Sequence, residues 1–542
     1  MALPLRGSTR LLSGALLAAL ALSGCTAADA GPDASPGTRK EGGTLVFYAA
    51  PNPAFDPRQS YGWLNRALSD SLLDKDPATG RFLPWLATKW EHNPDQTEFT
   101  FHLRTDASFS DGVRVDAAAV KANFDGVRKD LAAGGGWYVR GQFEHYVETK
   151  VVDEHTVAVR FAKPNPSFLT TAATSQLAML SPRSFSIPLE KRRTEFVASG
   201  PFVVEKYVRD ERLVLKRRPD YTWGSALATH QGKAAIETIE VRLVAEPGVR
   251  EGALASGEAQ IAETPTVEGS ALLEQQGNKL YWNATVGIPY SLQPNFTKPL
   301  VRDIAVRRAL LRAIDRQELS ASVTGKVAPP ATSVITRTLN GYRDFSALLK
   351  YDPAGARKIL DDAGWRAGAD GIRVKDGERL HLVVTGAAED KTIQDAMVLI
   401  KDQAKAVGIE ITIKPETGIG PTWWQTGADL WFSGNRSAEA DVLRKMYQNA
   451  GTKAQPWLYE KSSEVSPQGQ RLQEVLQRQA VETDTAERDG LLAEAQKILI
   501  EDAVNIPLVE HASGFVAAAP QVRGLRLDGL SNLVVYDAWL DT

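Results

Sequence analysis

Hydrophobic and polar positions alternate most regularly between residues 79 and 124. Phe99, Phe101 and Leu103 are separated by single polar residues, which is the period-2 pattern of a strand with one buried face. A Ser-Asp-Gly turn follows, and Asp116 then precedes an alanine-rich run, where the N-cap of a helix is expected. The pattern predicts a compact α/β unit and goes no further.

Other stretches predict further strands and helices. The run 43–48 predicts a buried first strand, and apolar positions on one face predict a helix over residues 63–73. The spacing of apolar residues between 306 and 314 predicts an amphipathic helix. The apolar run 213–215 does not alternate, so we expect this strand to be buried on both faces.

Composition excludes several classes of function. The chain has 542 residues, 24% of them charged, with a formal net charge of −3, so it has no basic surplus for binding nucleic acid. A single cysteine excludes an intrachain disulfide and a multi-cysteine metal site. The seven histidines are scattered, so we expect neither a protein-built metal site nor a cofactor. The sequence also lacks the serine-elbow, phosphate-loop and zinc-helix motifs of enzymes.

The N-terminal segment is typical of an exported protein. Two arginines precede the apolar run 11–22, which is shorter than the roughly twenty residues that span a bilayer. The run ends in Leu-Ser-Gly-Cys, which resembles the lipobox of bacterial lipoproteins and would make Cys25 the site of lipid attachment. We therefore predict a lipoprotein signal peptide over residues 1–24 and a flexible tether over 25–42.

Several ordered motifs carry a resemblance to a known family. Within residues 79–124, the order is Gly, Pro, Leu-Ala, Trp, Thr-Phe, Leu-Arg, Phe and Asp-Gly. Further blocks include Gly-Pro-Phe at 200–202 and Arg-Arg-Pro-Asp-Tyr-Thr-Trp-Gly at 217–224. In order and spacing these resemble the bacterial extracellular solute-binding proteins of family 5, the peptide and nickel receptors of ABC importers. The resemblance covers about residues 43–542, and the signature at 79–124 is expected to identify the scaffold rather than the ligand.

The resemblance implies a two-lobed α/β clamp like the periplasmic binding proteins, of the large class II type with an extra subdomain in lobe I. It implies lobe I over residues 43–284, with the inserted subdomain at about 71–199. Lobe II would cover 285–509, and residues 510–542 would return to lobe I. A solute would bind between the lobes, and closure at the hinge would bury it.

The resemblance places a specificity segment at residues 423–441. Peptide-binding relatives have Gly-Trp followed closely by an aspartate that meets the peptide's α-ammonium. Here Asn435 follows Gly434, the position of that aspartate falls near Ala438, and Arg436 adds a cation. Only a shifted loop would let Glu439 or Asp441 take the role of the acid. These departures argue against an ordinary peptide and favour a ligand with an anionic group, although Arg436 and Glu439 could equally form a solvated pair.

Four further residues are candidates for ligand contact. Tyr48 and Asn52 belong to the first strand and the loop after it, which the resemblance places at the mouth of the cleft. Trp424 and Trp431 are candidate walls, because aromatic side chains often line ligand sites. For each of these residues, a role in the core or in a turn is an open alternative.

The predicted function is therefore that of a lipid-anchored receptor, which captures a small or peptide-like solute and delivers it to a membrane permease and its ATPase. We expect an exported monomer, held by its lipid on the outer face of the cell membrane or in the periplasm, and no enzyme. A ligand sensor without transport and a surface hydrolase are the alternatives. The family takes peptides, nickel chelates, glutathione-like compounds and some oligosaccharides, and the sequence does not choose among them.

Overall fold

Residues 40–542 form one structural unit. The computed structural model describes residues 39–541 except 52–54, 61, 136–138, 285, 325–327, 389, 419–422, 449–466 and 511. The predicted signal peptide, Cys25 and Asn52 therefore lie outside the described residues. The backbone of Trp424 is described, but its side chain is not.

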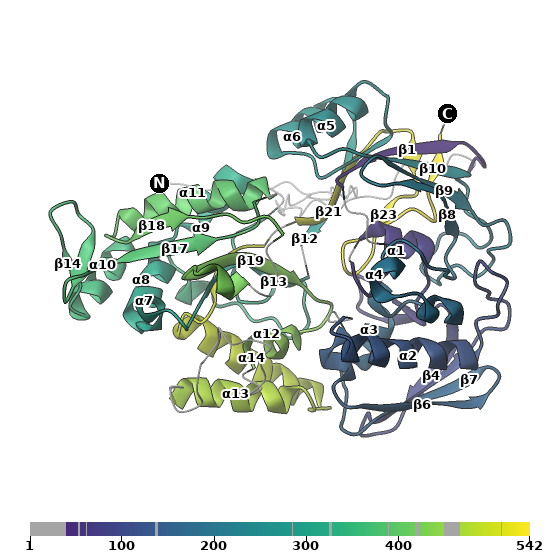
Figure 1. The fold of residues 1–542 in the computed structure, drawn as a ribbon, viewed down its shortest axis with the longest axis horizontal. Helices are drawn as coiled ribbons and strands as arrows, with labels where there is room; N and C mark the ends of the chain where they lie inside the picture. The colour runs from purple at the N-terminus through teal and green to yellow at the C-terminus, as the bar shows by residue number, and fades with distance from the viewer. Residues whose placement is uncertain are drawn as a thin grey trace, which may run out of the picture. The chain divides into compact units, whose positions relative to one another are not determined.

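A seven-stranded sheet organises the first half of the chain (Figure 1). In spatial order its strands are β12 (Lys279–Ala284), β21 (Ala512–Ala518), β11 (Ile261–Glu263), β1 (Thr44–Ala49), β10 (Thr238–Leu243), β9 (Arg212–Arg217) and β8 (Phe202–Val208). The central strand is β1, which confirms the predicted first strand and pairs in parallel with β10 and β11. One strand, β21, comes from the C-terminal part of the chain and pairs antiparallel with β11 and β12.

The prediction that residues 213–215 are buried on both faces is wrong. Leu213 and Leu215 are buried, whereas Val214 between them is only half-buried. The local sequence is apolar on both faces of β9, but core side chains cover only one of them. Burial in this strand depends on its neighbours in the sheet and not on its own composition.

A separate four-stranded sheet lies within the same half of the chain. In spatial order its strands are β4 (Ala87–His92), β5 (Glu98–Leu103), β7 (Thr156–Phe161) and β6 (Tyr146–Asp153). Phe99, Phe101 and Leu103 are the buried residues of β5, which confirms the alternating pattern. Helix α2 (Ala117–Ala132) lies along this sheet in Figure 1. It begins where Asp116 accepts a hydrogen bond from the Ala119 N–H, which confirms the predicted N-cap.

Helix α1 (Trp63–Leu68) is shorter than the predicted helix over 63–73. The Gly200 N–H donates a 2.9 Å hydrogen bond to the Leu68 carbonyl. In a longer helix, this carbonyl would instead accept from the N–H four residues further along the chain. Ser69 has extended backbone angles, and its hydroxyl donates to the Asn65 carbonyl. The chain therefore leaves the helix at Ser69, and β2 (Leu73–Lys75) soon follows and pairs with β3 (Phe82–Pro84).

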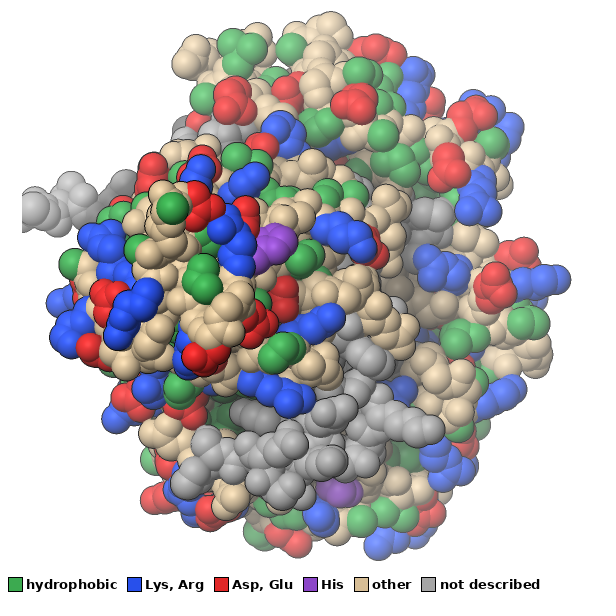
Figure 2. Space-filling view, turned by 60° about the vertical axis from the view of Figure 1, so that its left-hand side comes forward, with side chains coloured by type: hydrophobic (Ala, Val, Ile, Leu, Met, Phe, Trp, Pro, Cys, Tyr) green, Lys and Arg blue, Asp and Glu red, His purple; other side chains and the backbone are tan. Residues whose placement is uncertain are grey.

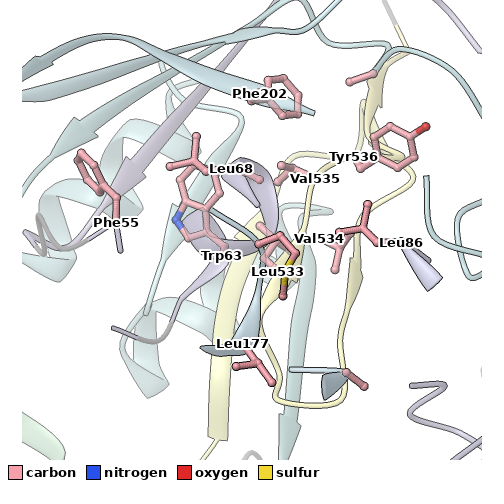
Figure 3. Packing of buried hydrophobic residues seen from close by; sticks show 14 of the residues in the cluster. Phe55, Trp63, Leu68, Leu86, Leu177, Phe202, Leu533, Val534, Val535 and Tyr536 are labelled. Carbon is pink, nitrogen blue, oxygen red and sulfur yellow. The ribbon is translucent and has the colours of Figure 1, made fainter. Parts of the chain in front are cut away.

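The C-terminal end of the chain completes the core around α1 (Figure 3). Trp63 and Leu68 of α1 belong to the same buried cluster as Leu533, Val534 and Val535. Two short hairpin pairs hold this end of the chain, β22 (Val522–Arg523) with β25 (Trp539–Leu540) and β23 (Arg526–Leu527) with β24 (Leu533–Val534).

A five-stranded sheet organises residues 287–509. In spatial order its strands are β18 (Glu410–Ile413), β17 (His381–Thr385), β19 (Leu430–Arg436), β13 (Gly287–Pro294) and β20 (Ile506–Val509). Helix α8 (Ile304–Ala313) confirms the amphipathic helix predicted from the sequence. A small sheet joins β14 (Arg366–Ala367), β15 (Arg373–Lys375) and β16 (Glu378–Arg379). The other α-helices are α3 (Phe168–Ala172), α4 (Leu189–Arg192), α5 (Pro247–Ala255), α6 (Val267–Gln275), α7 (Pro299–Arg302), α9 (Arg316–Leu319), α10 (Pro353–Asp362), α11 (Lys391–Lys405), α12 (Val442–Tyr447), α13 (Pro467–Gln479) and α14 (Thr485–Glu501).

Buried apolar side chains form two large clusters. The first draws on residues 45–273 and 516–538, and the second on residues 288–509. We call the parts of the chain that build these clusters lobe I and lobe II. The chain passes from lobe I to lobe II between β12 and β13, and returns after β20.

The surface mixes charges of both signs. On the face shown in Figure 2, Lys and Arg side chains are interspersed with Asp and Glu side chains, in agreement with the formal net charge of −3. No helix in the described ranges combines the length and the apolar composition needed to cross a bilayer.

Candidate functional site: a pocket between the lobes

A pocket of about 780 Å³ has walls from both lobes. Lobe I contributes the loop 76–80, part of α3 and the C-terminal loop 527–531. Lobe II contributes residues 338–340 and Ala438, and the crossing segment 280–283 forms a further wall. The volume lies within the range of small-molecule sites, and walls from two lobes allow a relative motion to open and close the pocket.

The most deeply buried charged groups of the pocket wall are paired with one another. Arg66 Nη2 donates a 2.9 Å hydrogen bond to Asp74, and its Nε lies 3.7 Å from Asp528. The guanidinium also lies 4.4 Å from the ring centroid of Trp85. The side chains of Arg66, Asp74 and Asp528 are all under 10% exposed. Buried charges that are paired in this way form part of a fixed wall.

Other polar side chains of the wall are not engaged in this way. Lys75 has no ion pair among the described residues, and its Nζ lies 5.6 Å from the ring centroid of Phe82. Among the described residues, neither the Trp282 indole N–H nor the Thr170 hydroxyl has a hydrogen-bond partner. The wall therefore offers N–H and O–H groups to a bound molecule. The described residues contain no cluster of three or more His, Cys, Asp or Glu side chains that could hold a metal ion.

The predicted specificity segment reaches the pocket through Ala438 and not through its acids. Glu439 lies at a contact between the lobes, where it accepts a 3.1 Å hydrogen bond from the Ser167 hydroxyl of lobe I. Arg488 Nη2 of lobe II donates to both Glu439 and Ser167, at 3.2 and 2.9 Å. Glu439 is 8% exposed. Its carboxylate is thus held by two partners at the lobe contact.

Asp441 is held by a second set of partners. Arg444 donates to its two carboxylate oxygens at 2.8 and 2.9 Å, and Gln479 Nε2 donates at 2.7 Å. Burial would raise the pKa of Asp441, but the Arg444 guanidinium holds that pKa below its usual value. Arg444 also donates to the Glu144 carboxylate of lobe I. Asp441 therefore supports a cation that bridges the lobes.

Arg436 and Asn435 lie at the end of β19, outside the wall of the 780 Å³ pocket. Asn435 Nδ2 lies 3.7 Å from the Met446 sulfur. The Arg436 charge acts on Glu263 of lobe I, whose pKa burial raises and whose carboxylate accepts from the Ala50 N–H. The predicted contact of Arg436 with an anionic ligand stays a prediction.

Tyr48 lies away from the pocket. Its ring is 6% exposed and packs with Ala253 and Ala259. Its hydroxyl donates a 2.7 Å hydrogen bond to Glu258 and accepts one from Arg242 Nη1. These contacts are those of a core residue, the alternative that the sequence left open.

Trp431 is half-buried and packs against the core of lobe II, outside the wall of the 780 Å³ pocket. Its ring stacks on that of Trp423, with centroids 5.3 Å apart. Trp423 belongs to the second buried cluster, and Trp431 packs against it. The side chain of Trp424 and the whole of Asn52 lie outside the described residues, so their predicted ligand contacts stay predictions.

Sequence reasoning missed the residues that do line the pocket. Trp282 and Asn283 lie in the crossing segment, where two aromatic residues and an asparagine directly before the expected hinge gave a signal. Thr79 and Gly80 also line the pocket, although the signature that contains them was expected to identify the scaffold. Thr170 gave no signal, because nothing in its local sequence places α3 against lobe II.

A family model and curated relatives match most of the chain. The model described as bacterial extracellular solute-binding proteins, family 5 Middle, matches residues 81–470. The glutathione-binding protein GsiB of Salmonella paratyphi A is 26% identical over 477 residues, which are 84% of this chain and 86% of GsiB. A putative ABC transporter peptide-binding protein of Brucella ovis is 26% identical over 428 residues, covering 75% of this chain and 74% of its own.

Solved structures share the fold over nearly the whole length. NikA from Brucella suis, in complex with Fe(III)-EDTA, has a TM-score of 0.78 at 22% identity and covers 92% of this chain and 100% of its own. DppA from Helicobacter pylori, in complex with the peptide STSA, has a TM-score of 0.74 at 21% identity. The match covers 93% of this chain and 99% of DppA. These likenesses confirm the predicted two-lobed α/β fold of the periplasmic binding proteins.

Proposed function

Because the chain belongs to the bacterial extracellular solute-binding proteins of family 5, we propose that it is the substrate-binding receptor of an ABC importer. It captures a small solute between its lobes and delivers it to a membrane permease with an ATPase. The relatives named above are described as binding glutathione and peptides. The proposal takes from them the role of a receptor and not the identity of the ligand.

The observation that carries the proposal is the pocket with walls from both lobes. The lobes have separate cores, so they can move as bodies about the two crossings of the chain. A solute in the pocket contacts lobe I through residues 76–80 and lobe II through Ala438. Some contacts with the solute form only when both lobes touch it. The free energy of these contacts favours the closed arrangement.

Anchoring and lobe boundaries complete the proposal. We take residues 1–24 as a lipoprotein signal peptide, Cys25 as the lipid attachment site and 25–42 as a tether, which leaves the body outside the cell membrane as a monomer. Lobe I comprises residues 43–284 and 510–542, with an inserted subdomain at about 71–199, and lobe II comprises 285–509. The ranges of the two buried clusters and the match to an extracellular family support this division.

Native mass spectrometry of the full chain, purified gently without refolding, tests the proposal. We expect a discrete non-covalent mass that is released unaltered on denaturation. Ala438→Trp, which fills the pocket wall, should abolish the bound mass. Ala118→Trp on the exposed side of α2 is the matched control and should retain it. An empty protein, or a bound molecule released in a chemically altered form, would overturn the role of a receptor.

A further inference from the structure

We infer that the pocket takes a solute that carries a carboxylate and no free ammonium group, with Lys75 and Trp282 as donors to it. This inference rests on the proposed function and narrows the class of its solute. The carboxylates of the wall already accept hydrogen bonds from the protein's own donors. The side-chain nitrogens of Lys75 and Trp282, which can only donate, have no hydrogen-bond partner among the described residues.

The two deepest carboxylates of the wall are saturated. Asp74 accepts from Arg66 Nη2, from the Ser225 hydroxyl at 2.5 Å and from the Lys75 N–H. Asp528 accepts from two backbone N–H groups at 2.8 and 2.9 Å and from Asn532 Nδ2 at 3.1 Å, and lies beside the Arg66 guanidinium. A ligand ammonium would have to displace a buried guanidinium to reach either group, and an uncompensated buried charge is costly.

The acid at the rim of the pocket is engaged as well. Asp76 accepts from the Thr79 hydroxyl at 2.7 Å and from the Ala78 N–H at 2.9 Å. Asp76 is half-buried, but these hydrogen bonds are exposed to solvent, so water competes with any ligand cation there. Across the pocket, lobe II presents the methyl group of Ala438, while Glu439 and Asp441 are held at the lobe contact. No described carboxylate of the wall is therefore free for a ligand ammonium.

The hydrogen-bond donors of the wall, unlike its carboxylates, include side chains without a partner among the described residues. An ammonium has three N–H donors and an indole has one, and neither group can accept a hydrogen bond. Among the described residues, neither Lys75 nor Trp282 has a hydrogen bond or an ion pair from its side-chain nitrogen, and both line the pocket. A carboxylate would satisfy both at once, and the Thr170 hydroxyl and the Asn283 amide provide further donors.

Matched pairs of probes, one member with an ammonium group and one without, test the inference. Binding of glutarate against glutamate, and of N-acetyl-alanyl-alanine against alanyl-alanine, is measured by calorimetry on the purified full chain. We expect an amine-free member to bind at least about tenfold more tightly than its amine-bearing partner, since one charged group left unpaired costs more than 1.4 kcal/mol. Equal or tighter binding of an amine-bearing member overturns the inference, as does the absence of saturable binding by both amine-free members.

Variants assign the donors. Lys75→Met should weaken binding of the amine-free probe about tenfold and remove its dependence on salt. Trp282→Phe keeps an aromatic ring and loses the indole N–H, and should weaken binding about threefold or more. Lys350→Met, at an exposed lysine outside the pocket, is the matched control and should change nothing. Unchanged affinity in both Lys75→Met and Trp282→Phe contradicts the assignment.

The two proposals fail in distinguishable ways. A native ligand that proves to carry an amine removes the carboxylate assignment and leaves the receptor intact. A protein that binds no solute in native purification removes the receptor itself.

Discussion

Ser167 donates a hydrogen bond to Glu439 although the two residues are 272 positions apart in the chain. Ser167 precedes α3 in lobe I, and Glu439 follows β19 in lobe II, so the bond spans the contact between the lobes. Arg488 pairs with Glu439 from within lobe II, so this ion pair does not depend on contact between the lobes. The bond to Ser167 is therefore specific to the arrangement in which the lobes are in contact.

Removing the Ser167 hydroxyl should speed the release of bound solute. Ser167→Ala leaves the Glu439–Arg488 pair intact but removes the hydroxyl's bonds to both of its members. Loss of hydrogen bonds to charged groups, about 1.5–3 kcal/mol each, should raise the dissociation rate roughly tenfold or more. Stopped-flow dissociation of the solute identified by mass spectrometry measures this rate. Ser69→Ala removes a hydroxyl bond within lobe I and should leave the rate unchanged. Equal rates in Ser167→Ala and wild type would show that the bond does not resist opening.

Asp70 should make the stability of the protein depend on pH. Burial raises its pKa from 3.8 to about 7, although Trp223, Tyr221 and Ser199 hydrogen bonds oppose the shift. A carboxyl group with a raised pKa in the folded state contributes stability below pH 3.8 that is lost as the pH rises through 7. Asp70→Asn is neutral at all pH values and should remove this loss.

The difference between the two proteins isolates the Asp70 contribution. Urea unfolding at pH 4.5 and pH 7.5 should show a larger decrease in the free energy of unfolding for wild type than for Asp70→Asn, at about 1.4 kcal/mol per unit of pKa shift. The same decrease in both proteins would mean that Asp70 titrates normally.

Gly200 should not tolerate a side chain. A Cβ at this position would lie 2.3 Å from the Leu68 carbonyl carbon and 2.5 Å from the Ser69 nitrogen, and both are backbone atoms. Gly200→Ala therefore has to push β8 away from the end of α1 and should lower the free energy of unfolding by about 3 kcal/mol or more. Gly252→Ala, inside α5 with nothing within 4 Å, should instead stabilise by about 1 kcal/mol. Denaturant unfolding compares the two, and a tolerated alanine at 200 would contradict the close approach.

A carboxylate at position 438 should reverse the preference for solutes. Ala438→Asp places an unpaired acid in the pocket wall opposite lobe I. The variant should bind alanyl-alanine more tightly than wild type does and N-acetyl-alanyl-alanine more weakly, each by about tenfold. Calorimetry with both probes checks this result. Ala118→Asp on the exposed side of α2 should leave both affinities at their wild-type values.

Loss of the cysteine should release the protein from the membrane. Cys25→Ala removes the proposed site of lipid attachment, and a single lipid anchor of this kind is what would hold the body. Cell fractionation should find the variant in the soluble fraction, with the thermal midpoint of the wild-type body. Retention in the membrane fraction would contradict lipid attachment at Cys25.

Local sequence patterns correctly predicted the elements whose form depends on their own residues. β5 and the N-cap of α2 follow from alternation and from Asp116 alone. The length of α1 did not follow, because a backbone N–H from Gly200 ends it. The burial of β9 did not follow either, because cover on each face comes from segments distant in sequence.

The site was harder to predict than the fold. The segment that ends at Asp441 does reach the pocket, but through Ala438, while its charged residues meet partners from other elements. The family resemblance implied that Glu439 and Asp441 lie near a cleft, but it did not indicate Ser167, Arg488 or Gln479 as their partners. Polar side chains compete for partners in three dimensions, so their roles depend on contacts that no local pattern contains.

The position of β21 sets the order in which the body can fold. This strand lies inside the seven-stranded sheet, between β12 and β11, yet it begins at residue 512 of 542. A growing chain cannot finish the sheet of lobe I until almost all of it has been synthesised, and until then the edges of β11 and β12 stay unpaired. The seven-stranded sheet of lobe I is therefore complete only after the C-terminal part of the chain has joined it. The last residues of the sequence thus decide when lobe I reaches its complete sheet.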